Sequence, residues 1–154
     1  MKNINIILIG TLFFQLISCQ SNSNSAFKNA LTFYVSFDQG TKADYALGDP
    51  NIYTADSRDS LDGMQVGMNN SDYQIVKGKG QFGDAFEFGK MSDKFVFYQS
   101  KDNITYDSKN WSGTISFWLS LDPATDLEPV YNDPIQITDT RFNDASIWVD
   151  FTDK

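Results

Sequence analysis

The feature that most constrains the fold is the run Trp111–Leu121, in which apolar and small polar residues alternate. The apolar members of the alternation are Ile115, Phe117, Leu119 and Leu121. Successive side chains of a β-strand point to opposite faces, so the pattern predicts a central strand with one face in the core. Trp118 falls on the other face, among threonine and serine residues.

Other short segments show the same period of two, or are rich in aromatic and β-branched residues between turn-forming residues. The further predicted strands are 31–38, 52–55, 73–76, 85–88, 94–98, 134–138 and 146–151. The rest of 40–70 is rich in Gly, Asp, Asn and Pro, which predicts a long loop region that either decorates the fold or binds a ligand. The many short strands predict an all-β sandwich or barrel.

The N-terminus is typical of an export signal. Lys2 precedes an apolar run, 4–17, which is shorter than the roughly 18 residues that cross a bilayer. Leu16-Ile17-Ser18-Cys19 resembles the lipobox of bacterial lipoproteins, in which the cysteine becomes the lipid-modified first residue. The alternative is an ordinary signal peptide with a free thiol. The expected division is a helical signal peptide at 1–18, lipidated Cys19 with a flexible tether to residue 30, and a folded domain at 31–154.

The charge balance bears on partners and location. The formal net charge is −8, and removal of Lys2 with the signal would make it more negative. Basic residues do not cluster, which argues against nucleic acid or an anionic membrane surface as a partner. Attachment to the membrane is therefore expected through the lipid alone. Gln20 after the cysteine resembles lipoproteins of the bacterial outer membrane, which is the expected location.

Three segments resemble the concanavalin A-like lectin/glucanase superfamily, and in particular its laminin G-like members: Phe33–Asp38, Gly80–Gly89 and Trp111–Leu119. They match the family's opening strand ending in Asp, its Gly-x-Phe-Gly-x-Ala turn and its Thr-x-Ser-x-Trp strand. The resemblance implies an antiparallel jelly-roll β-sandwich. Such domains usually continue well past the third segment, so it also implies a partial or unusually small domain.

The sequence disfavours several kinds of catalysis. It has no histidine, and its one cysteine is assigned to the lipid, which excludes Ser-His-Asp and Cys-His nucleophilic sites and disfavours ordinary zinc sites. Only Glu87 and Glu128 are glutamates, and the carboxylate pattern of the glucanase branch is absent. A fragment of a glycoside hydrolase remains an alternative to a binding domain without activity of its own.

Two groups of residues are candidate ligand contacts. The first is aromatic and falls opposite the apolar face of its strands, where a sugar ring could stack: Trp118, Trp148, Tyr98 and Tyr34. These rings could instead fill a second layer of the core. The second group could bind calcium, which takes 6 to 8 oxygen ligands: Asp56, Asp59, Asp62 and Asp38. The alternative, which the sequence favours, is that they are solvated turn residues.

These observations favour a lipid-anchored, exported, lectin-like domain that binds a glycan. A protein-interaction or adhesion domain with an extracellular protein partner is the alternative.

Overall fold

The computed structural model describes residues 23–57, 61–107, 109–127, 132–138 and 147–151. The chain forms two compact units, one ending at Leu31 and the other beginning at Thr32. In the first unit, helix α1 spans Ser23–Ala30, where the sequence predicted a tether without structure. The Leu31 N–H donates to the Phe27 carbonyl at 3.0 Å and continues the last turn. A helix this short is marginal in water on its own.

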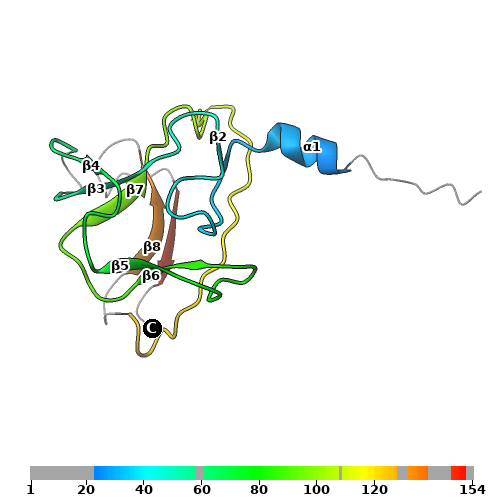
Figure 1. Ribbon diagram of the computed structural model, residues 1–154. Helices are drawn as coiled ribbons and strands as arrows, with labels where there is room; N and C mark the ends of the chain where they lie inside the picture. Colours follow the sequence, from blue (N-terminus) through cyan, green and yellow to red (C-terminus); the bar gives the residue numbers. More distant parts are fainter. Residues whose placement is uncertain (1–22, 58–60, 108, 128–131, 139–146, 152–154) are drawn as a thin grey trace, which may run out of the picture. The chain divides into compact units, whose positions relative to one another are not determined.

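The described residues of the second unit form four small antiparallel sheets (Figure 1). They are β1–β2, β4–β3–β7, β5–β6 and β8–β9. The strands are β1 Phe33–Tyr34, β2 Tyr45–Ala46, β3 Ile52–Ala55, β4 Gln65–Val66, β5 Tyr73–Val76, β6 Ala85–Phe88, β7 Phe95–Tyr98, β8 Asn132–Ile137 and β9 Ile147–Phe151. The predicted antiparallel β character with little helix is therefore confirmed.

Of the strands that the structure describes, β3 is the best buried, and it lies at the centre of the three-stranded sheet. Ile52, Thr54 and Ala55 are all buried. Tyr53 lies directly across from Phe97 of β7, and their rings stack with centroids 5.8 Å apart. The buried Thr54 hydroxyl donates to the Gly67 carbonyl at 2.6 Å, so its polar atom is satisfied. Cross-strand aromatic pairs and satisfied buried polar groups are what stabilise a sheet.

Asn103 joins the loops around this sheet and is 2% exposed. Its side-chain amide donates to the carbonyls of Asp49 and Gln99, both at 2.8 Å. Its side-chain oxygen accepts from the Gly48 N–H at 2.9 Å. A Cβ on Gly48 would lie 2.6 Å from the Lys101 carbonyl oxygen, so this close approach requires glycine. We call Asn103 with these three backbone partners the Asn103 hub.

The hairpin β5–β6 packs through aromatic rings. Tyr73 is buried, and its ring lies 5.9 Å from Phe86 and 5.3 Å from Phe88. Its hydroxyl donates to the Lys94 carbonyl, which satisfies the polar end of the side chain. The predicted boundaries 73–76 and 85–88 agree with these two strands.

The prediction of a central strand at Trp111–Leu121 is wrong. This segment is neither helix nor strand, and Figure 1 draws it as a yellow trace without an arrow. Among the described residues none forms a backbone hydrogen bond with 112–121. Alternation determines which side chains share a face, but a strand also needs a neighbouring backbone. The pattern is present in this segment, but the described residues supply no pairing partner for it.

The prediction of a strand at 31–38 was too long. Only Phe33 and Tyr34 pair with β2, and the Leu47 N–H adds one bond to the Thr32 carbonyl at 3.0 Å. Phe37 has φ of 68°, a backbone conformation that a strand cannot contain and that bulky residues rarely adopt. The chain therefore turns before Asp38. Within the expected loop 40–70, the strand at 52–55 is confirmed as β3.

Candidate binding surface

Among the described residues, the most exposed aromatic contact of the second unit joins Phe82 and Trp118. Their ring centroids lie 5.7 Å apart and the ring planes meet at 79°, an edge-to-face arrangement. Phe82 is 82% exposed and Trp118 is 71% exposed. Folding usually buries rings of this size, because each carries a large apolar area. We call these two residues the aromatic pair.

Phe82 is presented by the turn between β5 and β6. The Gly80 N–H donates to the Gly83 carbonyl at 2.8 Å and closes the turn. Asp84 accepts from the Gly78 N–H at 2.9 Å, which fixes the start of the turn. A turn residue belongs to neither face of a strand, so the side chain of Phe82 is free to point outward.

Asp38 holds this turn from a distant part of the chain. Its carboxylate accepts from the Asp84 N–H at 2.7 Å. A Cβ on Gly83 would collide with the same carboxylate, so glycine is needed for the close approach. The residue that the sequence suggested as a calcium ligand therefore positions the turn that carries Phe82.

The other three predicted sugar contacts lie elsewhere. The Tyr98 hydroxyl donates to the Thr41 carbonyl at 2.6 Å, and its ring packs edge-on against Phe33 at 5.1 Å. Burial, followed by the nearby Asp44 carboxylate, raises the pKa of Tyr98. Tyr34 on β1 and Trp148 on β9 are about half exposed, at 51% and 50%. Within the described part of the chain, no ring contact links any of the three to Trp118.

The predicted calcium ligands do not form a cluster among the described residues. The Asp56 carboxylate forms an ion pair with the Lys94 ammonium group. Asp62 lies in the loop before β4, and Asp59 lies outside the described residues. In the described ranges, no group of three or more His, Cys, Asp or Glu side chains could hold a metal ion. Calcium binding stays a prediction.

The carboxylate of Glu87 is used in a cross-strand contact. Gln74 and Glu87 lie opposite each other in β5–β6, and the Gln74 amide donates to the Glu87 carboxylate at 2.5 Å. Glu128, the other glutamate, lies outside the described residues, as does Cys19.

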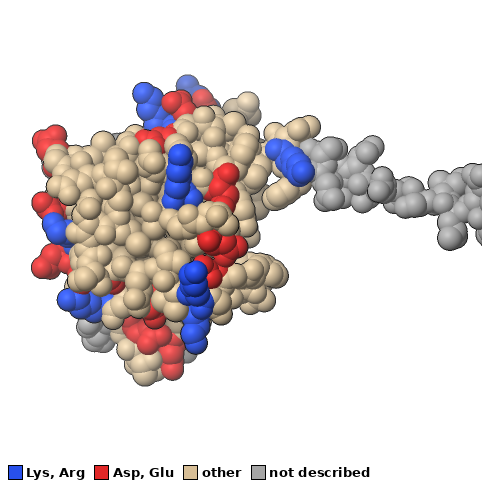
Figure 2. Space-filling model, viewed as in Figure 1, with Lys and Arg blue, Asp and Glu red and all other residues tan. Residues whose placement is uncertain are grey.

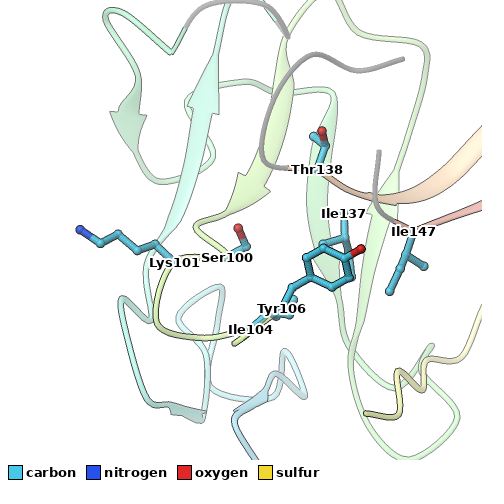
Figure 3. A pocket seen from close by; sticks show the side chains of 7 residues that line it. All are labelled: Ser100, Lys101, Ile104, Tyr106, Ile137, Thr138 and Ile147. Carbon is cyan, nitrogen blue, oxygen red and sulfur yellow. The ribbon is translucent and has the colours of Figure 1, made fainter. Parts of the chain in front are cut away.

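A small pocket of about 130 Å³ lies between the loop after β7 and the hairpin β8–β9. It is lined by Ser100, Lys101, Ile104, Tyr106, Ile137, Thr138 and Ile147 (Figure 3). The Lys101 side chain points away from the other six, which leaves a mostly apolar lining. The pocket holds no acid–base pair and is smaller than a typical ligand site of about 300 to 1,000 Å³.

Charged side chains are distributed without a single-sign patch on the face shown in Figure 2, where lysines and acidic residues alternate with uncharged surface. In the part of the chain that the structure describes, no helix is long and apolar enough to span a bilayer.

Comparison with known family models, curated proteins and solved structures found no match.

Proposed function

We propose that this chain is an exported carbohydrate-binding domain of the concanavalin A-like jelly-roll class, held at the membrane by a lipid on Cys19. The observation that carries the proposal is the aromatic pair, in which Phe82 and Trp118 contact each other while most of both rings remains open to solvent. An exposed ring offers a flat apolar face of the kind that the C–H face of a sugar can cover.

The contact with Phe82 adds order to this surface. A tryptophan ring held by a neighbour loses less conformational entropy when a ligand binds, which favours affinity. Exposed hydroxyl residues occupy alternate positions around Trp118: Thr114, Ser116 and Ser120. Each hydroxyl can both donate and accept a hydrogen bond, which suits a neutral, hydroxyl-rich ligand.

Binding of soluble oligosaccharides tests the proposal. The full chain is applied to a glycan array, and the best binders are titrated by calorimetry. Trp118→Ala should weaken binding at least tenfold, a change of about 1.4 kcal/mol, because it removes the stacking face. Phe27→Ala is the matched control, since Phe27 is 68% exposed but lies on α1 in the other unit.

Two results would contradict the proposal. One is the absence of any bound glycan at millimolar concentration, and the other is equal weakening by Trp118→Ala and Phe27→Ala. A protein-interaction or adhesion domain would then be favoured, because Ile115 and Leu119 are also partly exposed, at 40% and 45%, and aliphatic side chains suit a protein partner better than a sugar.

The calcium site is a separate part of the proposal. Titration of chelator-treated protein with Ca²⁺ should show binding that Asp62→Asn weakens. Since calcium stabilises whichever state binds it, the melting temperature should rise with added Ca²⁺. An unchanged melting temperature up to millimolar Ca²⁺ would contradict the site.

The lipid anchor is tested by metabolic labelling with a radioactive fatty acid. Cys19→Ser should abolish labelling and release the protein from the membrane fraction, because Cys19 is the only cysteine in the chain. Labelling that persists in this variant would rule out the anchor.

A further inference from the structure

The segment 112–121 has the alternating sequence of a strand but forms neither helix nor strand. Every residue from Ser112 to Ser120 is exposed, and no described residue forms a backbone hydrogen bond with the segment. Unpaired backbone N–H and C=O groups in a strand-forming sequence are a template for pairing with another chain. The apolar positions are partly exposed as well: Ile115 is 40%, Phe117 38% and Leu119 45% exposed.

The charge pattern indicates that the chain which pairs with this segment is a second copy of the protein. From Asn110 to Leu121 there is no charged residue, in a chain whose formal net charge is −8. Two copies of an acidic protein repel each other, so the uncharged run is a place where they can approach at low cost. Lys109 precedes the run and Asp122 follows it, and both are exposed. Antiparallel pairing brings each Lys109 toward the other copy's Asp122, whereas parallel pairing brings like charges together.

The alternation is also complementary to itself. Residues directly opposite each other in an antiparallel pair lie on the same face of the sheet. If two copies pair about a twofold axis at Ser116, Ile115 lies opposite Phe117 on the apolar face, and Thr114 lies opposite Trp118 on the other. The uncharged run of each copy then lies opposite the uncharged run of the other over nearly its whole length. A register shifted by one residue would place apolar side chains against polar ones.

We propose that two copies of this chain associate through antiparallel pairing of segment 112–121, with Ser116 at the twofold axis. The segment lacks charge and proline and is rich in strand-forming residues, which is the composition that favours intermolecular strand pairing. This proposal does not depend on glycan binding. On the polar face it places both Trp118 rings on the same side of the new ribbon.

Sedimentation velocity on the full chain tests the association, in the Cys19→Ser background so that no lipid or native thiol contributes. The mass should rise with concentration from 17.4 kDa to twice that value. Ser116→Lys should weaken dimerisation at least tenfold, because it places like charges opposite each other at the axis. Gln65→Lys is the matched control: it makes the same change in charge at another exposed residue and should leave dimerisation within twofold of the parent.

Disulfide trapping tests the register. In the same background, Ser116→Cys should form a covalent dimer under mild oxidation, because residue 116 of one copy lies opposite residue 116 of the other. Ser120→Cys should not, because it lies opposite Ser112. A parent protein that stays a monomer to several hundred micromolar would overturn the proposal, as would equal weakening by Ser116→Lys and Gln65→Lys. Equally efficient trapping at both positions would overturn the proposed register. Circular dichroism melts check that each variant is folded.

Discussion

Strand β3 and the segment 112–121 are alike in sequence and opposite in structure. Both are rich in β-branched and aromatic residues, and both lack charge. In β3, Ile52 is 4% exposed and the backbone pairs with β4 on one side and β7 on the other. In 112–121, Ile115 is 40% exposed and the described chain supplies no backbone partner. The difference shows that strand propensity takes effect only when a second backbone and a covering layer are present.

The two regions also differ in how their ends are held. Strand β3 is preceded by Gly48 and Asp49, whose backbone groups bond to the Asn103 side chain. The Asp49 carboxylate also accepts from the Asn51 N–H at 2.9 Å and from the Tyr53 hydroxyl at 2.5 Å. Segment 112–121 is preceded by Trp111, whose ring folds back over Gly113. Side-chain hydrogen bonds to a loop fix the position at which a strand begins. Substitutions around β3 should therefore lower the free energy of unfolding more than substitutions in 112–121.

The largest effect is expected from Asn103→Ala. The substitution leaves the Gly48 N–H and the carbonyls of Asp49 and Gln99 without their partner. Each buried polar group that loses its partner costs about 1 to 3 kcal/mol, so the free energy of unfolding should fall by about 3 kcal/mol or more. Urea denaturation followed by circular dichroism measures the loss.

Two controls sharpen this prediction. Asn110→Ala changes the same side chain at an exposed position and should alter the stability by less than about 0.5 kcal/mol. Asn103→Asp keeps an acceptor for Gly48 but loses both donors, so it should destabilise nearly as much as alanine. If Asn103→Ala and Asn110→Ala cost the same, the hub does not stabilise the fold.

A matched pair of isoleucine substitutions compares the two regions directly. Ile52→Ala removes a buried side chain and should cost about 2 to 5 kcal/mol, through lost burial and the cavity left behind. Ile115→Ala should cost less than about 1 kcal/mol in the monomer, because much of its surface already faces solvent. Chemical denaturation at low protein concentration measures both. Equal costs would mean that 112–121 is packed as well as β3.

The smallest expected effect is on the pH dependence of stability. The Tyr53 hydroxyl and then the Asn51 N–H hydrogen-bond to the Asp49 carboxylate and hold its pKa below the usual value of 3.8. The resulting stabilisation is present above pH 4 or so, where an unfolded aspartate is ionised, and is lost as the pH falls through the lower pKa of the folded state.

The Asp49→Asn variant should therefore lose less stability than the parent protein when the pH falls below about 4. The free energies of unfolding of the two proteins should differ most at neutral pH. Urea midpoints measured across this range test it. The run from Asn110 to Leu121 contains no titratable side chain, so Ser116→Ala should leave the pH profile unchanged. An unchanged profile in Asp49→Asn would contradict the role of its hydrogen bonds.

Much of the fold could be predicted where the sequence carries both a strand pattern and its turn. The strands β5 and β6 were predicted with their boundaries because a Gly-rich turn separates two short aromatic segments, and such hairpins pair locally. The prediction of a strand at 112–121 was wrong because alternation within one segment does not show whether a distant segment pairs with it. The predicted strand at 31–38 was longer than the observed one because nothing in the sequence signals the positive φ of Phe37.

The candidate site was predicted in part. Trp118 was singled out by its position opposite the apolar face, and it is exposed. Its neighbour Phe82 was missed because a turn residue has no place in an alternation. A phenylalanine between Gly80 and Gly83 is nevertheless a readable signal, since such a short turn has no interior in which to bury a ring. The separation of Tyr98 from Trp118 follows from strand pairings that the sequence does not encode locally.

The Asn103 hub has a consequence for the order of folding. Its bonds to Gly48 and Asp49 span 55 and 54 residues of chain, whereas the bond to Gln99 spans only 4. Closing a long loop costs entropy before any contact repays it, and structures rich in such distant contacts fold slowly. The Gln99 bond can form with the local turn, but the other two must wait until β3 has found β7. We therefore expect the full hub to form after the rate-limiting step, so that Asn103→Ala accelerates unfolding far more than it slows folding, as stopped-flow rates in urea would measure.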